Sequence, residues 1–322
     1  MTRIRRRPVS HPDLDGCRQY ARQPRSSSEP SVSTDRSCNP IIVGAPDARV
    51  VAADVARALA EDIGPGDLSA QLVSADAVGE AELWAREDLV LAGQAWFEAC
   101  VHALDANAVV TWDHAEAGRV SAGSRLCSVS ARARALLSAE RAAMNFLQTL
   151  SGTATITAQY VALTAGSRTR ILDTRKTLPG LRYAQKYAVR AGGGVNHRMG
   201  LYDAILIKEN HILAAGGIAT AIARARALAP GCMVEIEVES LDEYRQAVAA
   251  RPDRIMLDEL SPGDLRQALD ERPAEIELEL SGGIEMERLS ELCALGVDYL
   301  SIGALTKHVH AIDLSMRWKT AG

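Results

Sequence analysis

The sequence predicts a two-domain α/β protein, in which a mixed α+β domain precedes an incomplete α/β barrel. The 322 residues are 47% hydrophobic, which is enough to bury the cores of two domains. Aromatic residues make up only 4% of the chain, and cores of Ala, Val, Leu and Ile are typical of α/β layers. From about residue 169, short apolar segments alternate with helical ones, which indicates βα units and a parallel sheet.

Residues 1–40 differ in composition from the rest of the chain. They contain eight Arg, no Lys and four acidic residues, a charge of +4 in a protein of net charge −5. Ser and Pro are abundant and no hydrophobic period is present, so we expect a disordered Arg- and Ser-rich extension. An organellar targeting peptide is an alternative, although the acidic residues and the missing amphipathic period speak against it. Translation from an upstream start codon is another.

The predicted N-terminal domain covers residues 41–152. It opens with helical spacing over 48–59, which the Gly-Pro-Gly turn at 64–66 stops. Strands and one helix follow, over 81–93 (two strands), 94–104 (helix), 108–113 and 118–131 (short strands). A long amphipathic helix is expected over 133–152, with Leu137, Met144, Leu147 and Leu150 on one stripe.

The predicted barrel covers residues 153–304. Its strands are expected at 169–174, 203–208, 233–239, 254–258, 275–281 and 298–303, with helical stretches between most of them. Six strands over about 135 residues predict an incomplete barrel rather than an eight-stranded one. Residues 305–322 are expected to form a C-terminal helix that returns to the N-terminal domain.

Charge and cysteine usage exclude several classes of function. The pI of about 5.9 argues against a nucleic-acid partner, and no apolar run is long enough to span a bilayer. The six cysteines show neither a CxxC pair nor a histidine at metal-ligand spacing, and they are scattered at Cys17, Cys38, Cys100, Cys127, Cys232 and Cys293. This pattern predicts reduced thiols in a cytoplasmic protein.

A dense group of basic residues between Arg175 and Lys208 is the most informative feature. Seven Lys and Arg accompany a single acid, so the segment carries +6. Because like charges repel and buried charges are costly, a ligand with several negative charges explains the group better than folding does. A solvated helix face is an equal alternative for three residues spaced four apart, Arg182, Lys186 and Arg190. It is a weaker one for those at strand ends or glycine turns, which are Arg175, Lys176, Arg198 and Lys208.

Polar residues follow the predicted barrel strands, where barrel enzymes place their reactive groups. They are Arg175 and Lys176, Lys208, Glu237 or Glu239, Asp258, Ser281, and Ser301 with Gly303. Alternation in strand 233–239 puts Glu235, Glu237 and Glu239 on one face. That face either lines the barrel or is the solvated face of an antiparallel strand. Carboxylates opposite Lys and Arg fit a magnesium-bound polyphosphate.

Two turns near the end of the chain predict a phosphate site. Ser281, Gly282 and Gly283 lie between a strand and a helix, where free backbone N–H groups can bind phosphate. The segment 302–306 repeats this arrangement one strand later, as expected for the phosphate site after the last two strands of a barrel. The sequence contains neither a P-loop nor a dinucleotide-binding fingerprint.

Taken together, these motifs resemble the quinolinate phosphoribosyltransferase family, also called carboxylating nicotinate-nucleotide pyrophosphorylases. The most specific motif is KYAVRAGGGVNHRMGLYDAILIKENHI at 186–212, to which TRKTLPGLR, VEIEVE, IMLDEL, SGGI and ALTKH add. The resemblance spans roughly residues 45–318, and the first forty residues have no counterpart. Leu280 also departs from the family pattern, because many members have a small residue there.

The resemblance implies a fold and an activity. The fold is an N-terminal α/β sandwich followed by an incomplete α/β barrel, as in type II phosphoribosyltransferases. The activity joins quinolinate to phosphoribosyl pyrophosphate and yields nicotinate mononucleotide, CO2 and pyrophosphate for NAD synthesis, with Mg2+ as cofactor. Members form homodimers, and the resemblance leaves a higher oligomer open.

The resemblance also implies a role for individual residues. Arg175, His197, Arg198 and Lys208 would bind the two carboxylates of quinolinate, with Arg141 reaching across the dimer. Thr174 and Lys176 would contact substrate, Lys176 lying between quinolinate and pyrophosphate. Glu237 and Asp258 would hold the magnesium-bound pyrophosphate and, with Lys176, carry the catalysis. The 5-phosphate site would be formed by Ser281, Gly282, Gly283, Ile302, Gly303 and Ala304.

Three alternatives remain at this point. A molybdenum-transport-associated homologue of the same fold shares many of the glycines. Lys208 at a strand end could form a Schiff base in a barrel lyase. A phosphate-binding module without catalysis is the third.

Overall fold

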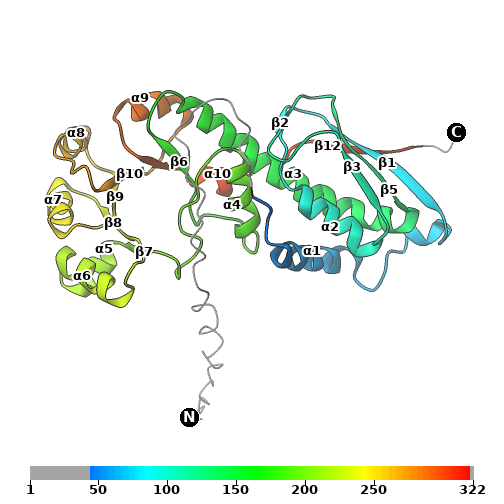
Figure 1. Ribbon diagram of the computed structural model, residues 1–322, viewed down its shortest axis with the longest axis horizontal. Helices are drawn as coiled ribbons and strands as arrows, with labels where there is room; N and C mark the ends of the chain where they lie inside the picture. Colours follow the sequence, from blue (N-terminus) through cyan, green and yellow to red (C-terminus); the bar gives the residue numbers. More distant parts are fainter. Residues whose placement is uncertain (1–43, 320–322) are drawn as a thin grey trace, which may run out of the picture. The chain divides into compact units, whose positions relative to one another are not determined.

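The structure of the protein is a computed structural model that describes residues 44–319 (Figure 1). The extension predicted at 1–40 lies outside the described residues. The first element is helix α1 (Ala48–Ile63), and a 3-10 turn (Ala70–Leu72) leads from it into the first sheet. Asp47 caps α1 by accepting a hydrogen bond from the backbone N–H of Arg49.

A four-stranded antiparallel sheet and three helices form the N-terminal domain. The sheet order is β12-β1-β5-β3, and a two-stranded ribbon joins β2 to β4. Its elements are β1 (Val78–Ala85), β2 (Leu89–Val90), α2 (Gln94–Leu104), β3 (Val109–Trp112), β4 (Arg119–Val120), β5 (Arg125–Arg132) and α3 (Ala133–Leu163). All were expected from sequence. Trp96 and Phe97 of α2 are fully buried in the core between the sheet and the helices.

Helix α3 is longer than the predicted helix, because it passes through Gly152 and continues to Leu163 (Figure 1). A Cβ atom on Gly152 would lie 2.0 Å from the backbone oxygen of His310. This glycine therefore permits a close approach of two backbones, and it does not end the helix.

The end of the chain is a strand, so the helix expected over 305–322 is wrong. After the short helix α10 (Ala304–Lys307), strand β12 (Leu314–Trp318) pairs antiparallel with β1. The chain does return to the N-terminal domain. The alternation in LSMRW buries Leu314 against the sheet core and leaves Trp318 more than one-third exposed. Hydrogen bonds along an edge strand thus outweigh the weak helical signal of this segment.

Six parallel strands form the second sheet, as the alternating βα pattern predicted. Their order is β6-β11-β10-β9-β8-β7, with the short extra bridge between Leu172 and Val195. The strands are β6 (Arg170–Leu172), β7 (Ile205–Ile207), β8 (Val234–Val238), β9 (Arg254–Asp258), β10 (Glu277–Ser281) and β11 (Tyr299–Ser301). This sheet and its helices confirm the incomplete α/β barrel.

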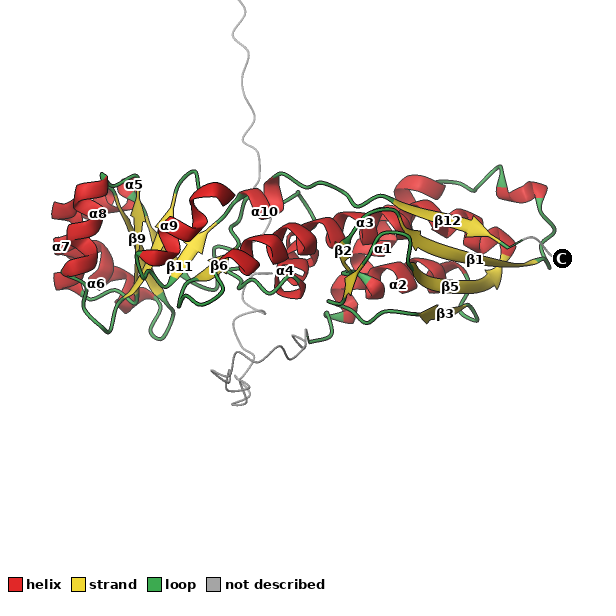
Figure 2. Ribbon diagram, turned by 90° about the horizontal axis from the view of Figure 1, so that it is seen from above, coloured by secondary structure: helices red, strands yellow, loops and turns green. Residues whose placement is uncertain are grey.

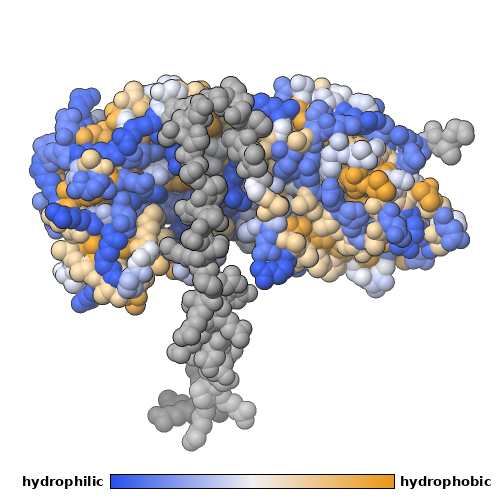
Figure 3. Space-filling model, viewed as in Figure 1, coloured by the Kyte–Doolittle hydropathy of each residue, from blue (hydrophilic) through white to orange (hydrophobic). Residues whose placement is uncertain are grey.

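The barrel helices are α4 (Arg182–Ala191), α5 (Glu209–Ala215), α6 (Ile218–Leu228), α7 (Leu241–Ala250), α8 (Pro262–Asp270) and α9 (Leu289–Ala294), which a 3-10 turn (Met286–Arg288) precedes. Helices α6, α7 and α8 lie along one side of the strands in both ribbon views (Figure 2). Ser240 and Ser261 cap α7 and α8 through their hydroxyls. Hydrophilic residues are dispersed over both domains on the face shown in Figure 3.

Strand β8 is buried on both faces, as expected of a parallel strand under helices. Val234, Ile236 and Val238 belong to the apolar core of the barrel domain. Glu235 and Glu237 alternate with them and therefore point to the other side of the sheet. The parallel pairing with β7 and β9 rules out the solvated antiparallel strand that the sequence had left open.

Candidate active site

A cavity of about 960 Å3 lies where the barrel strands end. Side chains and turns that follow β6, β7, β8, β9, β10 and β11 line it, because parallel strands bring their carboxyl ends to one edge of the sheet. The predicted site residues among its lining are Thr174, Lys176, Lys208, Glu237, Asp258, Ser281, Gly282, Gly283, Ile302, Gly303 and Ala304. The structure thus brings together most of the residues that were predicted to bind phosphoribosyl pyrophosphate.

Three glycines shape the side of this cavity that the sequence predicted to bind phosphate. Gly282 and Gly283 have φ angles of 93° and 45°, a left-handed turn in which a residue with a side chain would be strained. At Gly303, a Cβ atom would lie 2.8 Å from Cδ of Lys176. Because Gly303 has no side chain, the side chain of Lys176 can pack beside the turn that follows β11.

The acidic side of the cavity is formed by Glu237 and Asp258. Glu237 is buried, and its carboxylate forms an ion pair with Lys208. Glu239 is exposed and does not line the cavity, so the choice between Glu237 and Glu239 that the strand period left open falls on Glu237. The carboxylate oxygens of Glu209, Glu237 and Glu239 lie within 4.8 Å of one another, a set of hard oxygen donors that suits Mg2+.

Arg175, His197 and Arg198 lie next to this cavity in sequence but are not among its lining residues. All three are partly buried. Burial lowers the pKa of Arg198, and the positive charge of Arg175 adds to the effect. This repulsion is expected for two cations that await an anionic ligand.

Both ring nitrogens of His197 face protein atoms. Nδ1 accepts a hydrogen bond from the backbone N–H of Arg198 at 2.7 Å, and Nε2 lies 2.9 Å from Oε2 of Glu235. Burial lowers the pKa of His197, which favours the neutral ring. In this geometry the imidazole joins the backbone of Arg198 to the buried Glu235.

A buried charged network lies on the inner face of the barrel sheet. Glu279 accepts a hydrogen bond from the hydroxyl of Ser301, and Nη1 of Arg254 donates to it at 3.1 Å. Burial raises the pKa of Glu279 to about 8, and the nearby Glu235 adds to this shift. Burial also raises the pKa of Glu235. The network lies against His197 through Glu235.

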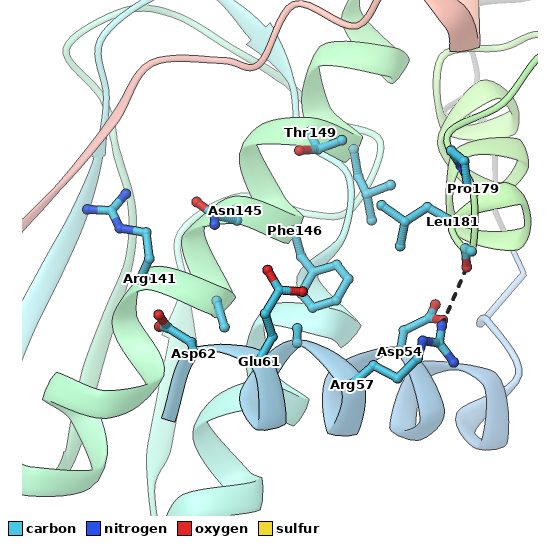
Figure 4. Close-up of a pocket in the computed structure, with 14 residues that line it drawn as sticks. Asp54, Arg57, Glu61, Asp62, Arg141, Asn145, Phe146, Thr149, Pro179 and Leu181 are labelled. Carbon is cyan, nitrogen blue, oxygen red and sulfur yellow. Dashed lines mark hydrogen bonds and ion pairs between the residues drawn. The ribbon is translucent and has the colours of Figure 1, made fainter. Parts of the chain in front are cut away.

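Arg141 occupies a second cavity, of about 390 Å3, between α1, α3 and the segment 179–181 (Figure 4). Its side chain is exposed and lies on the same helix as Asn145 and Phe146. It is absent from the lining of the larger cavity. Within one subunit, the structure therefore does not unite Arg141 with the other predicted site residues.

Comparison with known proteins gives consistent relatives over most of the chain. Residues 67–151 and 153–317 match the models of the N-terminal and C-terminal domains of quinolinate phosphoribosyl transferase. The chain belongs to the quinolinate phosphoribosyl transferase family. It is 43% identical over 258 residues to a probable nicotinate-nucleotide pyrophosphorylase [carboxylating] of Bacillus subtilis, with 80% of this chain and 89% of that protein covered.

A human relative and a solved structure agree with this assignment. The human nicotinate-nucleotide pyrophosphorylase [carboxylating] is 37% identical over 259 residues, which are 79% of this chain and 86% of that protein. The structure of the nicotinate-nucleotide pyrophosphorylase from Francisella tularensis superposes with a TM-score of 0.82 at 44% identity, covering 88% of this chain and all of that one. The family predicted from the motifs is confirmed.

Sequence reasoning missed several residues of the larger cavity. Lys307 ends α10 and His308 follows it, Tyr160 lies on α3, and Glu259 follows β9. Lys307 and His308 could have been found, because they directly follow the predicted phosphate segment 302–306. Tyr160 could not, because nothing in the sequence brings the end of α3 to the strand ends.

Lys186 fits neither of the two interpretations that the sequence allowed, a solvated helix face or a contact with an anionic ligand. The side chain is fully buried and lines neither cavity. Arg190, on the same face four residues later, is exposed.

Proposed function

We propose that this protein transfers the 5-phosphoribosyl group of phosphoribosyl pyrophosphate to quinolinate with decarboxylation, giving nicotinate mononucleotide, CO2 and pyrophosphate for NAD synthesis. The observation that carries the proposal is the cavity at the barrel strand ends. It brings together Lys176, Lys208, Glu237 and Asp258 with the two glycine-containing turns at 281–283 and 302–304. Family membership supplies the substrate class.

The quinolinate side of the site rests on its cations. Quinolinate is a dianion, and Arg175, Arg198 and Lys208 supply the charge-assisted hydrogen bonds that two carboxylates require. His197 acts on quinolinate at least indirectly, because its Nδ1 accepts a hydrogen bond from the backbone N–H of Arg198. A pocket with this many cations discriminates against nicotinate, which carries one carboxylate.

The ribosyl pyrophosphate side rests on Lys176, the carboxylates and the turns. Glu237 and Asp258, which both line the cavity, would hold Mg2+ together with the pyrophosphate, because carboxylate oxygens are the donors that this ion prefers. Mg2+ held there would offset the charge of the departing pyrophosphate, and Lys176 would do the same from the protein. The turn at 281–283 and the backbone of Gly303 and Ala304 would bind the 5-phosphate, whereas the backbone N–H of Ile302 already donates to the carbonyl oxygen of Leu172.

The reaction needs positioning and a fixed electrostatic field more than a nucleophilic side chain. The bond from the ribose to pyrophosphate breaks and leaves positive charge on the ribose ring, which Glu237 and Asp258 stabilise. The quinolinate nitrogen then bonds to the ribose. The cationic ring draws the electrons of the adjacent carbon–carboxylate bond, CO2 leaves, and the ring carbon takes up a proton.

Arg141 is proposed to complete the site of the partner subunit in a homodimer. Its position in a separate cavity supports this assignment, because a residue that serves its own subunit would lie with the other cations. A two-fold dimer uses the same surface of both chains, so each chain gives one arginine and receives one.

We also propose that the enzyme acts in the cytoplasm. Cys100, Cys127, Cys232 and Cys293 are free thiols, three of them buried. Among the described helices, none has the length and hydrophobicity to cross a membrane.

The alternatives find less support. A Schiff-base lysine is activated in an apolar pocket or beside another cation, whereas Lys208 is 42% exposed and paired with Glu237. The deciding experiment incubates the protein with quinolinate, phosphoribosyl pyrophosphate and Mg2+ and measures nicotinate mononucleotide. Product with quinolinate, but not with nicotinate in its place, supports the proposal. Turnover of nicotinate alone, or of neither acid, contradicts it.

A further inference from the structure

A fully buried ion pair lies beneath the two segments that carry the quinolinate cations. Asp173 directly follows β6, and Lys186 is in the middle of α4; both side chains are 0% exposed. Their carboxylate and ammonium groups are in direct contact. Burial raises the pKa of Asp173 and lowers that of Lys186, and each charge opposes the shift of the other.

The pair also binds the backbone of the second cation-bearing segment. Asp173 Oδ1 accepts the backbone N–H of His197 at 2.8 Å, and Oδ2 accepts the side-chain amide of Asn196 at 2.6 Å. Lys186 donates to the carbonyl oxygen of His197 at 2.9 Å. Both hydrogen-bonding groups of the His197 backbone are thus held by one buried ion pair.

The sequence positions explain what this arrangement does. Asp173 stands two residues before Arg175, and His197 stands one residue before Arg198. Strand pairing between β6 and Val195 ends just before both cations. The ion pair therefore ties together the backbone segments that carry Arg175 and Arg198, whose positive charges oppose each other.

Stability alone does not account for such a pair. Removing two charges from water is costly, and apolar residues of similar volume often stabilise a fold as well or better. A buried ion pair is best explained where it selects one geometry among several. Here the selected geometry is the spacing between the segments around Arg175 and Arg198.

We propose that Asp173 and Lys186 are positioning residues for the dicarboxylate substrate, which act through the backbone of His197 on the placement of Arg198 relative to Arg175. This inference rests on the proposed assignment of those two arginines to quinolinate. Phosphoribosyl pyrophosphate, on the far side of Lys176, does not depend on this spacing.

The test compares Michaelis constants in two pairs of variants. The double variant Asp173→Asn/Lys186→Met removes both charges at similar volume and leaves no lone buried ion. We expect its KM for quinolinate to rise at least tenfold, and its KM for phosphoribosyl pyrophosphate to change less than threefold. Asn196→Ala, which removes one hydrogen-bonding side chain only, should show the same selectivity with a several-fold rise.

The matched control is Arg272→Met/Asp298→Asn. This ion pair is also largely buried, but it lies before β10 and β11, at the opposite ends of the strands from the cavity. It should lower the melting temperature without changing the KM for quinolinate. The control separates a general loss of stability from a loss of positioning.

Two results would overturn the inference. One is an unchanged quinolinate KM in the folded double variant and in Asn196→Ala. The other is an equal rise in both Michaelis constants, which would indicate general damage. The variants Arg175→Ala and Arg198→Ala distinguish two kinds of failure. Either the positioning role of the ion pair is wrong, or the assignment of the two arginines to quinolinate is wrong. If neither arginine variant weakens quinolinate binding, the assignment is wrong and the positioning role falls with it.

Discussion

Lys208 and Glu237, 29 positions apart in the sequence, form an ion pair at the ends of the neighbouring strands β7 and β8. The lysine is assigned to quinolinate and the glutamate to the magnesium-bound pyrophosphate. In the free protein each of these charges is balanced by the other. Under the proposed assignment, a dicarboxylate that binds Lys208 would release the Glu237 carboxylate for the cation, so the two halves of the site would be electrostatically linked.

The first prediction concerns the quinolinate cations. Lys208→Ala and Arg175→Ala should each weaken quinolinate binding by about 10- to 100-fold, because a hydrogen bond to a charged group contributes roughly 1.5–3 kcal/mol. Binding of phosphoribosyl pyrophosphate should change less. Titration calorimetry measures both affinities. Arg190→Ala is the control, because this arginine of the same basic segment is exposed and lines neither cavity. Unchanged quinolinate affinity in both test variants would refute the assignment.

The second prediction concerns the shared site. Arg141→Ala and Asp258→Ala should each be nearly inactive. When the two variants are unfolded together and refolded, half of the dimers are mixed, and each mixed dimer holds one intact site. Activity should therefore return to about a quarter of the wild-type value under random pairing.

Each variant refolded alone serves as the control for this mixing experiment. Mass spectrometry of the refolded sample shows whether mixed dimers form. If they form and activity does not return, Arg141 acts within its own subunit.

The third prediction concerns the pH dependence of stability. The pKa of Glu279 is raised to about 8 in the folded protein by burial and by Glu235, with Arg254, His197 and Ser301 as its other neighbours. Between its ordinary value of 4.5 and about 8, the folded state keeps a proton that the unfolded chain has lost. Wild-type stability due to this group therefore falls as pH rises through that range.

The variant Glu279→Gln lacks this titration. As the pH rises from 5 to 8.5, the melting temperature of this variant should increase relative to that of the wild type. The gain follows because a tenfold difference in proton affinity between the folded and unfolded states corresponds to about 1.4 kcal/mol, or roughly 2–4 °C. Thermal melts across this range measure the difference. A difference that stays constant with pH would show that Glu279 is ionised throughout.

The fourth prediction concerns the close approach at Gly152. A Cβ atom there would lie 2.0 Å from the His310 carbonyl oxygen, so Gly152→Ala must displace the backbone that leads to β12. We expect a loss of about 1–3 kcal/mol, seen as a melting temperature several degrees lower. Gly263→Ala is the control, because its Cβ would meet only Ser261 Oγ at 3.8 Å and alanine favours the helix. Equal melting temperatures for the two variants would contradict the steric argument.

The sequence by itself determined the elements and the reactive ends of the strands. Parallel strands buried on both faces are short apolar runs, so TRILDT, DAILIK and RIMLD could be located within a few residues. Because all such strands end at one edge, Lys208, Asp258 and either Glu237 or Glu239 could be assigned to one site before their contacts were known.

Only the tertiary structure decided three points. It placed Glu237 rather than Glu239 in the cavity, because the last paired residue of β8 is Val238. It turned the end of the chain into β12, whose hydrogen bonds come from a strand more than two hundred residues earlier. It also showed that Lys186 is buried against Asp173, whereas the helical spacing predicted that Lys186 lies on a solvated helix face or contacts a ligand. These features depend on contacts between distant segments, and the local pattern of side chains carries no information about such contacts.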